Sequence, residues 1–279
     1  MSEASKNIYY TVCRIVNHTI NGETKTGFGF FMNFVLKNGK TIRTVLTCKH
    51  VVQGYRILEF YSCTDDGNAN PQDKIPFKMV CEIGKNDEFV VVHPTLDLAA
   101  LIFSYDNRIF LQGNSQPCYL SLEESVIPKN ENDINYIQDV LMIGFPENVY
   151  DKVNNKPIAR RGLTATPFQL DFNDEKQFLL DVASFHGSSG SPVFVFNDGI
   201  YTTNNTICSG LRIYLLGIFT GGWEEKNDAY KLVECIDGEK ISKMKIKLPN
   251  NLGFVLKSST FIEMKELLEE FVENNLTNL

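Results

Sequence analysis

The sequence predicts an all-β protein that ends in one α-helix. Short runs rich in β-branched and aromatic residues recur along the chain, separated by clusters of Asn, Gly, Asp and Pro. This pattern is typical of antiparallel strands joined by turns, and its spacing suits a β-barrel or a β-sandwich. We expect strands at residues 8–16, 27–36, 42–48, 55–61, 88–92, 98–103, 139–144, 177–182, 192–196, 212–219 and 252–257.

The end of the chain has the periodicity of a helix. Thr260 and Glu263 form the T-x-x-E pattern of a capping box, which marks a helix start. Apolar residues then recur at helical spacing: Phe261, Met264, Leu267, Leu268 and Phe271. We therefore expect a helix within residues 259–279.

Composition and charge exclude several classes of protein. The 279 residues are 43% hydrophobic, which suffices for a substantial core. No run of 18 apolar residues occurs, and the first residues are polar, so we expect neither a membrane partner nor a signal peptide. The net charge is −7 and no basic stripe alternates with aromatic residues, which argues against a nucleic-acid partner.

The seven cysteines indicate reduced thiols. Their number is odd, they are scattered, and no C-x-x-C pair occurs. A disulfide framework or a zinc site would have another pattern. We therefore expect a cytoplasmic protein that holds no metal and needs no cofactor.

Residues 187–192, with the sequence G-S-S-G-S-P, frame Ser189 with two glycines. A nucleophilic serine needs a tight turn that exposes its Oγ atom, and Gly187 can adopt the backbone angles of such a turn. The N–H groups of Gly187 and Ser189 could then bind a developing oxyanion. By itself, the hexapeptide is equally compatible with an ordinary turn before a strand.

A serine hydroxyl needs a base that a third group orients. His50 lies near the end of the apolar, β-branched run 44–52, where a predicted strand enters a turn. Asp97 heads the apolar run 98–103, where an unpaired carboxylate is costly and a histidine N–H is its natural partner. The order His50, Asp97, Ser189 is one of three known for this triad geometry. The sequence therefore predicts these three residues as catalytic.

The remaining candidates have plainer interpretations. His186 lies three residues before Ser189 and is predicted at the rim of a substrate pocket. His93 precedes Pro94 and is predicted as a surface or loop residue. Cys48 lies two residues before His50 and is predicted to act as a small buried hydrophobe.

On these residues the chain resembles the trypsin-like serine peptidases of the chymotrypsin fold (PA clan), in particular their HtrA-type intracellular branch. Residues 47–52 resemble the branch's T-x-x-H-V-V, residues 97–101 its D-L-A-x-L, and residues 187–192 its G-N-S-G-G-P. Weaker similarities occur in the same order and extend the match over roughly residues 10–270: 26–31, 142–146, 161–165, 216–222 and 251–258.

The resemblance implies two six-stranded antiparallel Greek-key β-barrels with a C-terminal α-helix. The N-terminal barrel would span 1–105 and carry His50 and Asp97, and a linker would span 106–137. The C-terminal barrel would span 138–258 and carry Ser189, and the helix would span 259–279. We expect no appended PDZ domain.

The resemblance also implies a serine endopeptidase that cleaves a protein or peptide through an acyl-enzyme. Two departures matter. Ser188 stands where trypsin-like zymogens have an Asp that pairs with a new N-terminus, so we expect constitutive activity or control by a partner protein. Ala183 stands where trypsin has the Asp at the floor of its primary pocket, and with Thr220, Gly221 and Gly222 it predicts a pocket for apolar or uncharged side chains. Substrate would add as a strand along residues 220–222.

Two other functions compete with this one. A catalytically silent, peptide-binding pseudo-protease would keep the fold without the chemistry, which the intact His50, Asp97 and Ser189 argue against. A lipase or esterase would have G-x-S-x-G and a serine before its histidine, whereas here the histidine comes first.

Overall fold

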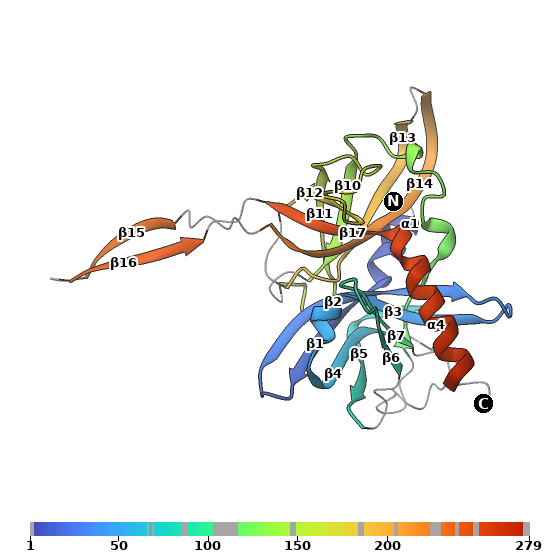
Figure 1. Ribbon diagram of the computed structural model, residues 1–279, viewed down its shortest axis with the longest axis horizontal. Helices are drawn as coiled ribbons and strands as arrows, with labels where there is room; N and C mark the ends of the chain where they lie inside the picture. The colour runs from blue at the N-terminus through green and yellow to red at the C-terminus, as the bar shows by residue number, and fades with distance from the viewer. Residues whose placement is uncertain are drawn as a thin grey trace.

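The computed structural model describes residues 3–65, 67–68, 70–84, 89–102, 117–145, 149–183, 187–203, 206–223, 230–237, 240–247 and 251–275. Within these ranges the protein consists mainly of two β-sheets, and its last element is a helix (Figure 1). The prediction of an all-β protein with a C-terminal helix is therefore confirmed. None of the helices in the described part has both the length and the apolar character of a membrane span.

The first sheet has nine strands. Seven follow the order β5-β4-β1-β2-β3-β7-β6, β8 pairs with β4, and β9 pairs in parallel with β2. The short helix α1 (Glu3–Asn7) precedes β1 in the chain, and the short helix α2 (Lys49–Val52) lies between β3 and β4. Its strands are β1 (Val12–Thr19), β2 (Thr24–Val35), β3 (Thr41–Thr47), β4 (Tyr55–Asp65), β5 (Pro71–Glu82), β6 (Val90–Val92), β7 (Ala99–Ile102), β8 (Pro117–Cys118) and β9 (Leu122–Glu123).

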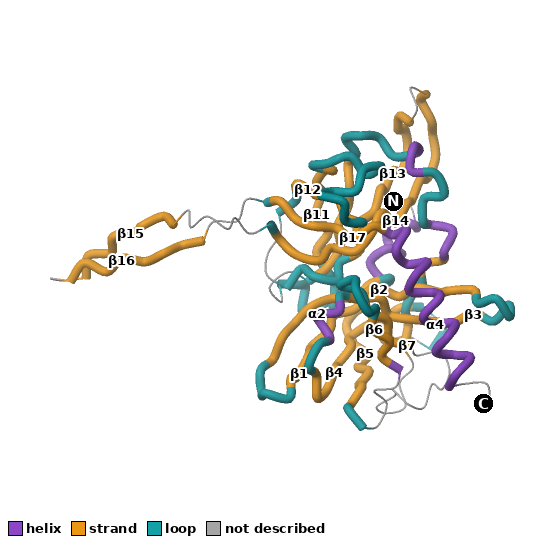
Figure 2. The backbone as a smooth tube through the Cα atoms, in the orientation of Figure 1, coloured by secondary structure: helices purple, strands orange, loops and turns teal. Residues whose placement is uncertain are grey.

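The second sheet is a closed barrel of six strands in the order β10-β11-β12-β17-β14-β13. These strands are β10 (Asp139–Gly144), β11 (Ile158–Thr164), β12 (Gln177–Asp181), β13 (Pro192–Thr203), β14 (Thr206–Gly222) and β17 (Leu252–Lys257). A separate hairpin of β15 (Tyr230–Asp237) and β16 (Lys240–Lys247) projects from the body of the protein (Figures 1 and 2).

Burial of apolar side chains explains both sheets and their contact. One core cluster extends from Phe28 and Phe30 of β2 to Phe194, Leu215 and Ile218 of the barrel, so it joins the two sheets. A second cluster fills the barrel itself. Because burying a large apolar side chain contributes about 1.5–3 kcal/mol, the shared cluster fixes the two sheets against each other.

Helix α4 (Phe261–Asn275) follows the last barrel strand and packs on the first sheet (Figure 2). Its buried Phe261, Met264, Leu268 and Val272 recur every three to four residues, which gives one apolar face. The Phe261 and Phe30 rings lie 6.0 Å apart. The helix therefore ties the end of the barrel to the first sheet.

Three local expectations differ from the structure. The first sheet has nine strands and not the six expected, because β5 and the short strands β8 and β9 are additional. Strand β5 forms despite Pro71 and Pro76 because it lies at one end of the strand order, where proline is tolerated. The β15–β16 hairpin was not expected. The capping box does not form as predicted, because Thr260 Oγ1 donates to Lys257 O (2.7 Å) and Glu263 pairs with Lys176.

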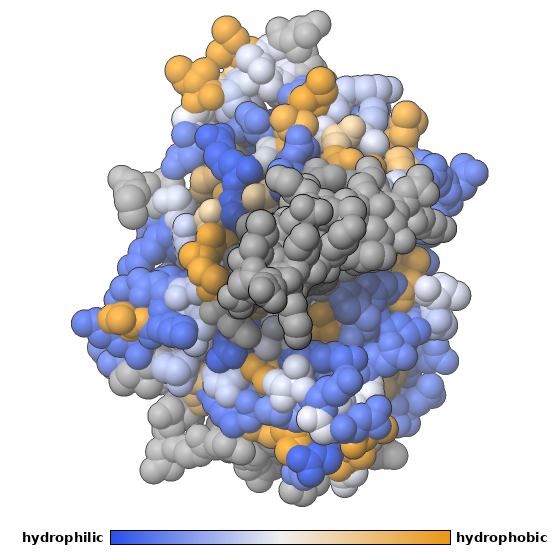
Figure 3. Space-filling model, turned by 90° about the vertical axis from the view of Figure 1, so that its left-hand side faces the viewer, coloured by the Kyte–Doolittle hydropathy of each residue, from blue (hydrophilic) through white to orange (hydrophobic). Residues whose placement is uncertain are grey.

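The face of the molecule drawn in Figure 3 is largely hydrophilic, and its apolar side chains lie in separate small groups. Scattered exposed apolar residues are ordinary for a folded protein, so this view adds no further site.

Candidate active site

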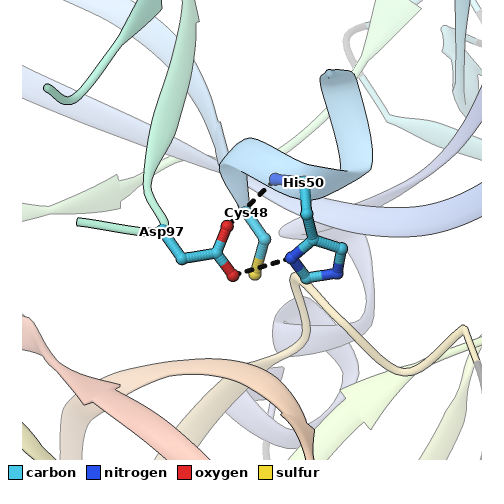
Figure 4. Close-up of side chains that lie close together, drawn as sticks. All are labelled: Cys48, His50 and Asp97. Atoms are coloured by element: carbon cyan, nitrogen blue, oxygen red, sulfur yellow. Dashed lines mark hydrogen bonds and ion pairs between the residues drawn. The ribbon is translucent and has the colours of Figure 1, made fainter. Parts of the chain in front are cut away.

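His50 and Asp97 contact each other at two points (Figure 4). His50 lies on the short helix α2, directly after β3, and Asp97 lies in the loop between β6 and β7. The Asp97 Oδ2 atom lies 2.7 Å from His50 Nδ1, and Asp97 Oδ1 accepts from the His50 backbone N–H at 2.9 Å. This two-point contact fixes the orientation of the imidazole ring.

The electrostatics of the pair determine the tautomer of His50. Burial alone would raise the pKa of Asp97. The hydrogen bonds and charge of His50, together with hydrogen bonds from backbone N–H groups, outweigh burial, so the pKa lies below its ordinary value. Asp97 is therefore ionised at neutral pH, and Nδ1 of His50 must donate to it. The Nε2 atom is then an acceptor, as a general base requires.

Ser189 lies in a tight turn just before β13. Gly187 and Gly190 adopt φ angles of 78° and 90°, in the left-handed region that glycine tolerates best. The Phe28 N–H of β2 donates to Ser189 O (2.9 Å), and the Gly190 N–H donates to Phe219 O of β14 (2.8 Å). The turn is therefore anchored to both sheets.

The Ser189 hydroxyl donates to the backbone oxygen of Thr220 at 2.9 Å. Between described residues, no hydrogen bond joins Ser189 Oγ to His50. The structure thus pairs His50 with Asp97 and places the Ser189 hydroxyl against β14. Within the same ranges the N–H groups of Gly187 and Ser189 donate no backbone hydrogen bond.

The predicted pocket residues lie around this turn. Thr220, Gly221 and Gly222 end strand β14, and the two glycines pair with Phe254 and Gly253 of β17. Ala183 is exposed and precedes the turn. His186 lies outside the described residues.

The sequence interpretation missed Arg160 of β11. Its Nη1 atom donates to Ala183 O (2.6 Å), and its Nη2 atom donates to Ser188 Oγ (3.1 Å). The sequence offered only a weak signal, a pair of adjacent arginines, of which one must face the barrel interior if the segment is a strand.

His93 lies in a loop, the second of the two predicted alternatives, but it is not at the surface. The residue is 5% exposed, and its Nδ1 atom accepts from the backbone N–H of Leu96 (3.0 Å) and Thr95 (3.3 Å). His93 therefore stabilises the loop that carries Asp97.

Cys48, His50 and Asp97 offer three potential metal ligands within 4.8 Å of one another (Figure 4). Cys48 is fully buried, burial and the nearby Asp97 raise its pKa, and its Sγ atom donates to Phe219 O (3.3 Å). His50 and Asp97 are bonded to each other. Because burial keeps the Cys48 thiol protonated, and the thiolate is the form that binds metals, we assign no metal to this group.

Two packed β-sheets, with an Asp-oriented histidine beside one and a glycine-framed serine beside the other, are the arrangement expected of a trypsin-like serine peptidase. The family model described as "Trypsin-like peptidase domain" matches residues 27–199, which is more than half of the chain. The chain therefore belongs to this family. No curated protein matches the sequence.

Solved structures of serine proteases share the fold. The chain is 16% identical to a serine endoprotease from Yersinia pestis (TM-score 0.51), covering 96% of this chain and 65% of that one. It is 14% identical to the HtrA-type protease AlgW with tripeptide (TM-score 0.51), covering 96% and 62%. The chain thus spans less than two thirds of each of these two proteins.

Proposed function

We propose that this protein is a serine endopeptidase in which His50, Asp97 and Ser189 are the catalytic residues. The observation that carries the proposal is the two-point contact between His50 and Asp97 beside the glycine turn of Ser189. Membership of the trypsin-like peptidase family supports it independently.

In the proposed reaction, His50 Nε2 takes the proton from Ser189 Oγ while Oγ forms a bond to the carbonyl carbon of the substrate. The Gly187 and Ser189 N–H groups bind the negative oxygen, and ionised Asp97 stabilises the imidazolium. The C–N bond then breaks, and His50 gives its proton to the leaving amine. Water repeats the cycle on the acyl-enzyme.

The first step requires a movement of one side chain. Ser189 Oγ donates to Thr220 O and must turn towards His50 before it can give up its proton. Catalytic hydrogen bonds are often formed only once substrate is bound, so this geometry is compatible with an active enzyme.

We propose an extended peptide as substrate, added as a strand along residues 220–222. Strand β14 pairs with β13 up to Ile218, and beyond that point β17 is its one strand partner among the described residues. The free edge supports strand addition. The small Ala183 favours an apolar or uncharged side chain in the pocket.

Three further parts of the proposal concern the whole protein. We place the start of the C-terminal barrel near residue 138 and the start of the helix near residue 259, with one peptidase unit overall. The expected end of the N-terminal barrel at residue 105 lies outside the described residues, and β8 and β9 extend the first sheet into the expected linker. A cytoplasmic location is supported by six cysteines that are free thiols: Cys13, Cys48, Cys63, Cys81, Cys118 and Cys208. A regulatory protein partner remains part of the proposal, because the Ser189 hydroxyl must be reoriented.

A fluorophosphonate probe tests the catalytic assignment, since it forms an adduct only with an activated serine. We expect one adduct by intact mass on the wild type and none on Ser189→Ala. Ser191→Ala is the matched control, because the Ser191 hydroxyl is buried without a partner among the described residues. An adduct that persists in Ser189→Ala would exclude Ser189 as the nucleophile. A peptide library then reports whether the labelled site cleaves peptide bonds.

A peptide-binding protein without catalysis is the second candidate, and the bond from Ser189 Oγ to Thr220 O favours it. The same labelling experiment distinguishes the two functions. A wild type that forms no adduct but still binds peptides would support the second candidate.

A further inference from the structure

Strand β11 carries two neighbouring arginines in different environments. Arg161 is exposed, whereas Arg160 is partly buried. Arg160 is the register partner of Met142, which is fully buried in the barrel core. Because directly opposed residues project to the same face of a sheet, the Arg160 side chain is directed into the barrel.

The guanidinium of Arg160 joins two points of the segment that precedes Ser189. Nη1 donates to the backbone oxygen of Ala183 and Nη2 to the hydroxyl of Ser188. Ser188 is 1% exposed and directly precedes Ser189. The planar guanidinium holds its donors in a fixed geometry, so these two bonds restrain the position of Ser188 relative to Ala183.

In the part of the chain that the structure describes, the charge of Arg160 has no carboxylate partner. No ion pair of Arg160 occurs among the described residues, and burial lowers its pKa to about 10. At neutral pH the side chain is still a cation. A cation next to the turn that must bind a negative oxygen is electrostatically favourable.

We propose that Arg160 is a positioning residue that holds residues 187–190, the oxyanion turn, in the shape that binds the oxyanion. The proposal rests on the proposed function, because it assumes that this turn stabilises the reaction at Ser189. It also explains why position 188 can be a serine, since the donor that fixes it comes from inside the barrel. The shape of the turn would then need no newly cut chain end.

The first test compares labelling rates by the fluorophosphonate probe. We expect Arg160→Gln to label about 10- to 100-fold more slowly than the wild type, the effect of one or two lost charged hydrogen bonds. Arg161→Gln is the matched control and should label at the wild-type rate. Arg160→Lys keeps the charge but lacks the planar pair of donors, and its labelling rate should lie between those of Arg160→Gln and the wild type.

Two readouts separate positioning from a general loss of structure. Guanidinium ion at millimolar concentration should restore labelling of Arg160→Ala and leave the wild type unchanged. Ser188→Ala should also slow labelling, and its effect should not add to that of Arg160→Gln, because the two groups share one interaction. Full additivity, or no rescue in a folded variant, would overturn the proposal.

Amide hydrogen exchange tests the positioning role of Arg160 without requiring Ser189 to react with the probe. In Arg160→Gln we expect faster exchange confined to a peptide that covers the oxyanion turn. If the wild type is labelled and Arg160→Gln is labelled equally fast, the role of Arg160 is overturned and the proposed function stands. An unlabelled wild type contradicts the proposed function instead. In that case, unchanged exchange in Arg160→Gln overturns the positioning role, and faster exchange supports it.

Discussion

Replacing Gly190 by alanine should separate the oxyanion turn from strand β2. A Cβ atom at this position would lie 1.7 Å from Phe28 O and 2.6 Å from the Phe28 carbonyl carbon. Real Cβ atoms do not approach within 3.0 Å, so the turn and the strand must move apart by more than an ångström. Phe28 cannot simply yield, because its oxygen accepts from Thr47 Oγ1 (2.6 Å) and its N–H donates to Ser189 O (2.9 Å).

The cost follows from these contacts. Alanine at a φ of 90° costs about 1–2 kcal/mol, and losing one or both Phe28 hydrogen bonds costs about 1 kcal/mol each. We expect the free energy of unfolding to fall by about 2–4 kcal/mol. Displacement of Ser189 by more than an ångström should slow its reaction with a fluorophosphonate probe by about 100-fold.

Gly22→Ala is the matched control. Gly22 has a φ of 84°, and a Cβ there meets nothing within 4 Å. This variant should show the backbone strain alone, a loss of about 1–2 kcal/mol in urea unfolding with an unchanged labelling rate. If Gly190→Ala labelled within about threefold of the wild type under conditions where both are folded, the turn would not be held against Phe28 in the way described.

Three further predictions concern the histidine segment. Asp97→Asn should lower probe labelling and peptide turnover by about four decades, because the wrong His50 tautomer is favoured. Since the pKa of Asp97 is lowered on folding, its ionised form stabilises the protein above the ordinary carboxyl pKa, and this contribution is lost as the pH falls through the lowered value. The stability difference between wild type and Asp97→Asn, measured by urea unfolding, should therefore shrink below about pH 4, and a difference constant down to pH 2 would contradict it. Iodoacetamide should leave labelling of the folded protein unchanged, because the Cys48 thiol is buried and its pKa is raised; an inactivation that Cys48→Ala prevents would refute this.

The sequence could predict those site residues whose signal is local. Asp97 is a carboxylate at the head of an apolar run, and Ser189 is framed by glycines, so each is conspicuous beside its own neighbours. The structure places Asp97 against His50 and places Ser189 in a left-handed glycine turn. The bond from Ser189 Oγ to Thr220 O depends on a side-chain rotamer and on a strand 31 residues away, so no local pattern could indicate it.

The features that the sequence did not predict depend on distant pairing. Strand β5 contains two prolines and charged residues, and its register with β4 is what makes it a strand. Adjacent Arg160 and Arg161 look alike in the sequence, and only the closure of the barrel decides which one points inward. His93 resembles a surface residue beside a proline, yet two backbone N–H groups bind its ring.

The proposed site is a property of the contact between the two sheets. His50 and Asp97 lie on connections between strands of the first sheet, and Ser189 lies in the turn before barrel strand β13. The bond from Phe28 N to Ser189 O, the bond from Cys48 Sγ to Phe219 O and the stacked rings of Phe28 and Phe145 (5.4 Å) hold the two parts together. These contacts are backbone groups, a neutral thiol and aromatic rings, so they are insensitive to salt and to pH near neutrality. Arg160 acts on the barrel side of this contact, and His93 acts on the other. The geometry at Ser189 therefore requires both sheets to be folded and docked, and neither sheet alone contains a complete site.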